Sequence, residues 1–248
     1  MHRVLDLDLD FFVHEVVYWP DSDDRPDSDE HPVWAIDDVT AFLRGRCGLS
    51  GRLPGFVTEN HGELFPRWRS AIRDGLLIAP FHVTHVDAHA DLGLGDAGYV
   101  YLLTELLLKP PENRQHPRRG TEGLNDANHL AFAVACRWIS DLTYVYGEGG
   151  GSDELSLFMK DFDQKADYIQ LAALSRQPID LLLRQQKVVP LRLEPAVPYR
   201  SNRWENFHTD DPFDFVCLTR SPPYTPITAD PLFDAIRSAF IDELPVTG

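Results

Sequence analysis

The chain has 248 residues, of which 43% are hydrophobic and 25% charged, a composition typical of a folded globular protein with a large buried core. Its formal net charge of -16 at pH 7 argues against nucleic acid and anionic membrane surfaces as partners and favours a cationic one. The three cysteines are widely spaced, which fits a reducing compartment. The sequence shows neither a signal peptide, with its basic start and apolar run, nor an apolar run long enough to span a membrane. We therefore expect a cytoplasmic protein. We expect one domain over residues 1–248.

The first predicted element is a half-buried strand over Arg3–Phe12. Its apolar side chains alternate with Asp6, Asp8 and Asp10, which places the three carboxylates on one face. Carboxylates this close repel one another unless water or cations intervene. Open α/β sheets bind ligands at the carboxyl ends of their strands, so Asp8 and Asp10 are the preferred ligand candidates and Asp6 is held in reserve.

An acidic segment bounded by prolines follows at Pro20–Pro32. It carries six acidic side chains against one arginine, and it is either a solvated loop or a docking surface for a basic peptide. Helices are then predicted over Asp37–Arg46, capped by Asp37 or Asp38, and over Pro66–Asp74.

Between these two helices, a short strand beginning at Phe56 leads into a polar turn that contains His61. A lone histidine in a turn is more often a surface residue than a ligand. His61, however, stands beside Glu59 and Glu63 and shortly before a second acidic strand. We therefore treat it as a ligand candidate.

The densest cluster of acids and imidazoles is His85–Asp91, at the end of a buried strand predicted over Phe81–Val86. Alternation along an extended chain puts its two carboxylates and one or two imidazoles on one side. Like charges a few ångströms apart resist joint ionisation, and a divalent cation removes that cost. Mixed carboxylate and imidazole ligation suits manganese, iron or zinc better than calcium.

The stretch Gly93–Gly98 fits the G-x-G-x-x-G pattern of dinucleotide sites, but a charged motif precedes it, so we interpret the glycines as a turn. A core-packing helix is predicted over Tyr99–Leu108 and a buried helix over Leu130–Ile139. His129 precedes the second helix and is either a capping or core imidazole or a catalytic one. Glu148 lies in a glycine-rich run where backbone or ligand can approach closely.

The remaining segments continue an alternation of strands and helices. Helices are predicted over Ser152–Phe162 and Pro231–Leu244, and strands over Leu142–Tyr146, Tyr168–Ala172, Lys187–Leu193 and Phe213–Leu218. Strands interleaved with helices imply an α/β fold with a mostly parallel sheet and helices on both faces.

Three of the predicted strand ends carry six candidate metal ligands: Asp8, Asp10, His61, Asp87, His89 and Asp91. The carboxyl ends of parallel strands meet at one edge of a sheet, so these side chains can form a two-metal centre. Four carboxylates balance the charge of two divalent ions, and such ions activate water for hydrolysis.

The run Val86–Asp91 resembles the Asp-Ala-His-x-Asp signature of the arginase and ureohydrolase superfamily, whose fold resembles that of histone deacetylases and whose members use two manganese ions. A second Asp-x-Asp strand and a histidine after a polar turn are also present. Arginases place the turn histidine first and the Asp-x-Asp strand last, whereas here the Asp-x-Asp strand opens the chain. The resemblance therefore implies an arginase/deacetylase-like fold with a permuted topology.

The N-terminal Asp-Leu-Asp-Leu-Asp-Phe-Phe and the segments Glu59–Glu63 and Ser221–Tyr224 resemble an atypical branch of that superfamily, the peptide arginases. These enzymes convert arginine residues within ribosomally made precursor peptides to ornithine and release urea. The resemblance implies a binuclear amidinohydrolase with two Mn²⁺ ions, iron or zinc being alternatives, and an arginine-containing precursor peptide as its partner.

The same resemblance implies roles for individual residues. The metal ligands would be Asp8, Asp10, His61, Asp87, His89 and Asp91. His129 would be the proton shuttle, since Asn128–His129 resembles the Asn-x-His segment of arginases with one residue fewer. No acid stands near Cys217, where arginases carry the acid that pairs with guanidinium. Its replacement is left open between the catalytic candidates Glu148 and Glu59, and Glu63.

Three other functions are compatible with some of these motifs. A deacetylase-like amide hydrolase would use one zinc ion and a tyrosine or histidine that polarises a carbonyl group. A phosphatase fits poorly, because an acidic surface disfavours an anionic substrate. A non-catalytic, metal-stabilised peptide-recognition module would bind a peptide without changing its mass.

Overall fold

A computed structural model describes residues 1–248 except 21, 23, 94–96, 152–153, 176–187 and 246–248. Its centre is an eight-stranded sheet with the order β10-β2-β9-β1-β3-β4-β8-β5. Every pairing from β10 to β8 is parallel, and β5 joins β8 in the antiparallel direction. The predicted α/β class with a mostly parallel sheet is confirmed.

The strands of this sheet are β1 (Arg3–Asp8), β2 (Leu53–Thr58), β3 (Phe81–Val86), β4 (Ile139–Tyr146), β5 (Tyr168–Ile169), β8 (Val197–Arg203), β9 (Phe215–Thr219) and β10 (Ile241–Glu243). A separate antiparallel pair consists of β6 (Ala172–Ala173) and β7 (Arg192–Leu193). The α-helices are α1 (Ile36–Gly45), α2 (Leu64–Arg73), α3 (Gly98–Tyr101), α4 (His129–Ala135) and α6 (Asp230–Phe240).

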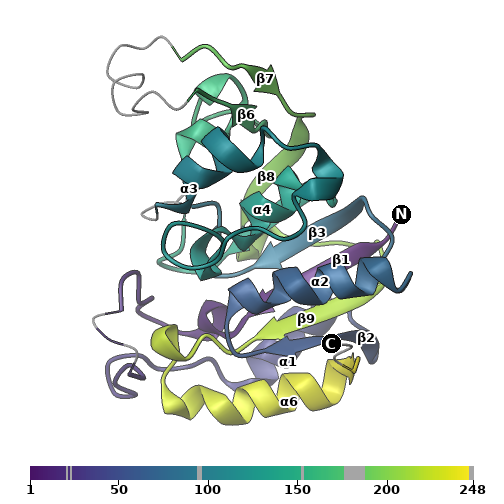
Figure 1. The fold of residues 1–248 in the computed structure, drawn as a ribbon. Coiled ribbons are helices and arrows are strands. Elements are labelled where there is room, and N and C mark those ends of the chain that lie inside the picture. Colours follow the sequence, from purple (N-terminus) through teal and green to yellow (C-terminus); the bar gives the residue numbers. More distant parts are fainter. Residues whose placement is uncertain (21, 23, 94–96, 152–153, 176–187, 246–248) are drawn as a thin grey trace.

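The sheet is covered on both faces because successive side chains of its strands enter two different apolar clusters. Val4 of β1 and Val83 of β3 pack with residues of α2 and α4 on one face. Leu5 and Leu7 of β1 pack with residues of α1 and α6 on the other face. Figure 1 shows α6 along the bottom of the molecule, with the sheet between it and α4.

β1 differs from the half-buried strand that the alternation predicts. It lies inside the sheet between β9 and β3, and even Asp6 and Asp8 are buried. The strand ends at Asp8 because that side chain accepts a hydrogen bond from the backbone N–H of Asp10 at 3.0 Å and starts a 3-10 turn over Leu9–Phe12. The acids of this strand are therefore held inside the fold, not on a solvated face.

Two predicted helices have different ends. The helix predicted to reach Ile139 stops at Ala135, and Ile139 opens β4. The last helix stops at Phe240, because the following residues form β10 and pair with β2. In both cases apolar residues that would suit a helix form a strand of the sheet instead.

Other predictions fail where the chain is irregular. The predicted helix from Ser152 begins outside the described residues, and its described part forms 3-10 turns at Ser156–Phe158 and Lys160–Phe162. Lys187 also lies outside the described residues, and the strand predicted from there is seen at β7. Strand β8 was not predicted at all, because Pro198 and the polar residues after it do not alternate with apolar ones.

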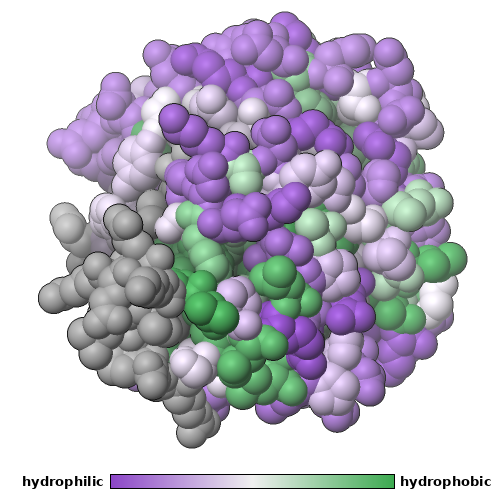
Figure 2. Space-filling model, turned by 90° about the horizontal axis from the view of Figure 1, so that it is seen from above, coloured by the Kyte–Doolittle hydropathy of each residue, from purple (hydrophilic) through white to green (hydrophobic). Residues whose placement is uncertain are grey.

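No helix within the described ranges has the length and apolar character needed to cross a bilayer. Figure 2 shows a largely hydrophilic face on which apolar side chains gather near its lower centre and at its right edge. The most exposed apolar side chains of the β7 neighbourhood are Val189, Leu191 and Leu193, at 79%, 62% and 52%. Leu193 lies in β7, and Val189 and Leu191 lie in the segment just before it.

Candidate metal centre

The three ligand motifs meet at the carboxyl edge of the sheet. β1 lies between β3 and β9, and β2 lies on the other side of β9. The residues that follow β1, β2 and β3 therefore come together, as parallel strands require. In Figure 1 the purple segment after β1 and the turn after β9 lie at this edge, at the opposite end of the sheet from the N-terminus.

His61 is the centre of the first group of candidate ligands. It opens a 3-10 turn, His61–Glu63, that follows β2. Its Nδ1 lies 3.0 Å from a carboxylate oxygen of Asp8, 3.1 Å from one of Asp87 and 2.9 Å from one of Asp91. One ring nitrogen cannot donate a hydrogen bond to three acceptors, so the four groups are arranged as ligands around a cation would be.

His89 forms a second group with Asp10 and Asp87. Its Nδ1 lies 2.9 Å from Asp10 Oδ2 and 3.6 Å from Asp87 Oδ1. Asp10 is held in place by the backbone N–H of Ala88, which donates to its Oδ1 at 3.2 Å. Asp87 therefore takes part in both groups, with Oδ2 toward His61 and Oδ1 toward His89. Asp87 could therefore serve as a metal ligand in either group.

Backbone geometry also points two side chains into the centre. Asp91 (φ 50°) and Ser221 (φ 49°) adopt the left-handed conformation, which is unfavourable for residues other than glycine. Asp91 reaches His61 in this way, and the Ser221 hydroxyl donates a hydrogen bond to Asp8 Oδ2. Backbone strain of this kind is concentrated at functional sites.

Two of the acids in this centre, Asp8 and Asp10, resist ionisation, whereas the neighbouring histidines hold the pKa values of Asp87 and Asp91 below the ordinary value against the effect of burial. Burial, followed by the charge of Asp87, raises the pKa of Asp8. Burial and then the charges of Asp8 and Asp87 raise the pKa of Asp10 well above its ordinary value. Burial opposes a charged His61, but the carboxylates of Asp8, Asp6 and Asp91 outweigh it and hold the pKa of the imidazole well above its ordinary value. Positive charge is thus strongly favoured at this place.

Several buried polar atoms fit metal ligation better than hydrogen bonding. Asp87 Oδ2, Asp91 Oδ2 and His89 Nε2 are buried and make no hydrogen bond within the described structure. Such atoms are costly unless a cation or water satisfies them. The residue types and burial therefore fit one or more metal ions.

Beneath these ligands lies a second buried group, made of Asp6, His85 and His129. Asp6 Oδ2 is 3.0 Å from His85 Nδ1 and 3.5 Å from His129 Nε2, and Asp6 Oδ1 is 3.5 Å from His61 Nε2. Metal-binding histidines commonly use their second nitrogen to contact a carboxylate, which fixes the orientation of the ring. Asp6 supports His61 in this way and does not line the pocket.

His129, the predicted proton shuttle, is not among the residues that line the pocket. It is fully buried and stacks on His61 with ring centroids 4.7 Å apart. Its Nδ1 is 3.1 Å from Asp91 Oδ2. It also belongs, with His61 and Asp91, to a group of side chains that could hold a metal ion.

The two glutamates predicted to be catalytic lie away from the centre. Glu59 is exposed and forms an ion pair with Arg220 at 3.1 Å, and Glu148 is exposed in the segment after β4. Glu63 lines a different cavity. Cys217 is buried in the core beside Asp6, where Trp68 Nε1 donates to its sulfur at 3.5 Å. None of these four residues lines the metal pocket.

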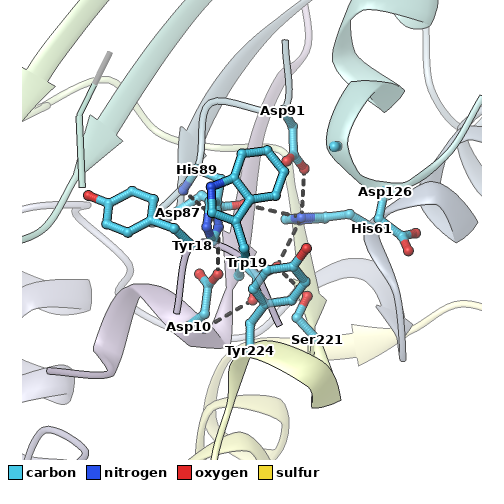
Figure 3. A pocket seen from close by; sticks show the side chains of 12 residues that line it. Asp10, Tyr18, Trp19, His61, Asp87, His89, Asp91, Asp126, Ser221 and Tyr224 are labelled. Atoms are coloured by element: carbon cyan, nitrogen blue, oxygen red, sulfur yellow. Dashed lines mark hydrogen bonds and ion pairs between the residues drawn. The ribbon is translucent and has the colours of Figure 1, made fainter. Parts of the chain in front are cut away.

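A pocket of about 230 Å³ opens onto both groups of ligands. Figure 3 shows the ligand candidates at its floor and aromatic side chains around them. Its further lining residues, which sequence reasoning did not assign to the site, are Tyr18, Trp19, Asp126, Ala127, Ser221 and Tyr224. Among these residues, the sequence points only to Ser221 and Tyr224, through the resemblance of the Ser221–Tyr224 segment to peptide arginases.

Comparison with protein-family models, curated proteins and solved structures found no match to this chain.

Metal binding at this centre is expected to release protons. A histidine must lose its proton to become a ligand, and the pKa of His61 is held well above its ordinary value by the surrounding carboxylates. Affinity for Mn²⁺ should therefore fall as the pH is lowered. Calorimetric titration with Mn²⁺ in two buffers of different ionisation enthalpy measures the released protons, and His61→Asn should release fewer. Equal heats in both buffers, with an affinity independent of pH, would contradict the expectation.

Proposed function

We propose that this chain is a metal-dependent hydrolase that uses a two-metal centre to convert arginine side chains in a peptide to ornithine, with release of urea. The observation that carries the proposal is Asp87, whose two oxygens face His61 and His89 at the floor of a pocket. Two divalent ions held by such ligands supply Lewis acidity and an activated water molecule.

The permuted order of the motifs is compatible with this proposal. His61 follows β2, Asp8 ends β1 and Asp87 follows β3. Along the sheet these strands occur in the order β2, β9, β1, β3, so that only β9 lies among them. Their spatial neighbourhood does not depend on which strand opens the chain. A permuted chain can therefore form the same centre as one that begins elsewhere.

The balanced reaction adds one water molecule to the guanidinium carbon. The bond between that carbon and the side-chain nitrogen breaks, oxygen stays with urea, and the departing amine takes up a proton. The chain's own contribution is to hold the ligands rigidly: the Ser221 hydroxyl and the backbone N–H of Asp10 both donate to Asp8. Such support keeps ligand geometry fixed during a reaction.

Amide hydrolysis is the second candidate, and Tyr224 favours it. Its ring lies edge-on to His89 with centroids 5.0 Å apart, and it lines the pocket. Burial and then the charges of Asp91, Asp10 and Asp126 outweigh the opposing effect of His89 and raise the pKa of Tyr224 to about 12. The phenol therefore stays protonated at neutral pH, as a donor to a carbonyl oxygen must.

The proposal is tested with a proteome digest made by a protease that cuts after glutamate, so that arginines remain internal. Incubation with the protein and Mn²⁺ is expected to yield urea and peptides lighter by about 42 Da per arginine, the mass of the CN₂H₂ unit removed by hydrolysis. Asp87→Asn should abolish both products. Asp210→Asn is the matched control, because Asp210 is exposed and pairs with His208 outside the pocket.

Other outcomes identify the alternatives. Loss of an acyl group from lysine, with no urea, would favour the amide hydrolase. Peptide binding without any change of mass would favour a recognition module.

A further inference from the structure

Three of the six residues that line the pocket besides the ligand candidates are aromatic. Apart from those ligands, the described lining consists of Tyr18, Trp19, Asp126, Ala127, Ser221 and Tyr224. No lysine or arginine of the described chain is among the residues that line it. An anionic group entering the pocket would therefore find no side-chain cation on its walls.

One of the two polar side chains on the walls is fully engaged, and one oxygen of the other is. The Ser221 hydroxyl donates to Asp8, so its proton is used by a candidate ligand. Asp126 Oδ1 accepts the backbone N–H of Gly62 at 2.8 Å, and Figure 3 shows Asp126 beside His61 at the edge of the site. Gly62 permits this approach, because a Cβ there would lie 2.8 Å from Asp126 Oδ1. Besides the second oxygen of Asp126, a substrate side chain meets three aromatic rings in this pocket.

Three aromatic rings surround the second group of ligands. Tyr224 and Tyr18 both meet His89 nearly edge-on, with centroids 5.0 Å and 5.9 Å away. Trp19 is 68% exposed and lies in front of the ligand cluster in Figure 3. A side chain that reaches the centre must pass along these rings.

Arg25 fixes the segment that carries Tyr18 and Trp19. Its guanidinium donates to the carbonyls of Thr225 and Pro226 at 2.6 Å and 2.7 Å, and to Asp230 at 3.0 Å. These contacts tie that segment to the one that follows Tyr224.

The net charge of the ligands and their ions determines which groups in the pocket can attract a cationic side chain. Asp8, Asp10, Asp87 and Asp91 together balance two divalent ions, so the floor of the loaded centre no longer attracts a cation strongly. The face of an aromatic ring still does, and a planar guanidinium stacks on it particularly well. We infer that Trp19 and Tyr224 recognise the cationic side chain of the substrate through their ring faces, in place of a paired acid. This inference rests on the proposed function.

The kinetic test uses an arginine peptide and the Mn²⁺-loaded protein. Trp19→Leu is expected to raise KM about tenfold, equivalent to about 1.4 kcal/mol, with kcat changed by less than about twofold. Trp19→Phe, which keeps an aromatic ring, should have a KM close to that of the unchanged protein. Tyr224→Leu should likewise raise KM, and Tyr224→Phe should change it little. Tyr168→Leu is the control for loss of an exposed ring outside the pocket.

A rise in KM for Asp126→Asn that exceeds the rise for Trp19→Leu would overturn the inference, because an acid would then be the recognition element.

A binding test separates this inference from the proposed function. Calorimetry compares a blocked pentapeptide with a central arginine and the same peptide with citrulline, which has a similar shape but no charge. We expect a preference of about tenfold for arginine that Trp19→Leu removes. If no urea forms but this preference is found, the proposed function fails and the recognition stands. If urea forms but Trp19→Leu keeps both KM and the preference, the recognition fails alone.

Discussion

Asp87→Asn is expected to remove most of the stabilisation that Mn²⁺ gives to this protein. With free Mn²⁺ at about 100 times each dissociation constant, each filled site adds about 2.7 kcal/mol. Two sites would together raise Tm by roughly 10–20 °C for a chain of this length. Asp87 faces both His61 and His89, so its loss should affect both sites. Thermal unfolding with Mn²⁺ or with a chelator measures the effect.

Neighbouring acids provide graded controls for this prediction. Asp91 contacts His61 and Asp10 contacts His89, so Asp91→Asn and Asp10→Asn should each remove one ion and about half of the shift in Tm. Asp210→Asn should keep both ions. Retention of two ions by Asp87→Asn, counted by elemental analysis, would show that Asp87 is not a shared ligand.

The convergence of the three motifs could be predicted because it depends on topology more than on detail. Once β1, β2 and β3 are read as parallel strands, the residues after them must share one edge of the sheet. The residue types then limit the chemistry, since buried clusters of aspartate and histidine need a cation. Asp8, Asp87 and His61 were therefore accessible from the sequence alone.

The sequence does not predict the second group of buried side chains, which lies beneath the ligands that line the pocket. Asp8 lines the pocket and Asp6 does not, in line with the preference for the residue nearer the carboxyl end of β1, but nothing in the sequence indicates that Asp6 contacts three histidines behind the pocket. His129 stands beside a polar segment in the sequence but lies behind His61 in space. Trp19 and Asp126 carry no spacing signal, since loops bring them to the pocket. Tertiary packing decides each of these positions.

The same distinction holds for the fold. Helix α1 and strand β3 were predicted closely, because their apolar periodicity matches the faces that they bury. Strand β8 escaped prediction, because it lies between β4 and the short β5 and needs no regular apolar alternation. The end of α6 was misplaced, because pairing of β10 with β2 overrides helical propensity.

Asp6→Asn is expected to destabilise the metal-free protein by about 3–5 kcal/mol, the usual cost of breaking a buried ion pair. Burial opposes a charged Asp6, but the charge of His61 and hydrogen bonds from His129, His61 and His85 keep its pKa well below the ordinary value. Asparagine preserves the volume and removes the charge that these imidazoles require. Because His61 also loses its supporting carboxylate, Mn²⁺ affinity should fall about 10–100-fold.

Asp8→Asn is the matched comparison, since Asp8 lies two residues away on the same buried strand. Burial and the charge of Asp87 raise the pKa of Asp8, so its ionised form is unfavourable before metal binds. Asp8→Asn should therefore leave the metal-free protein as stable or more stable, while it removes Mn²⁺ binding. Urea unfolding in the presence of a chelator distinguishes the two positions. If both variants lose stability equally, Asp6 is not a counter-ion for the histidines beneath the centre, and the two-layer arrangement is wrong.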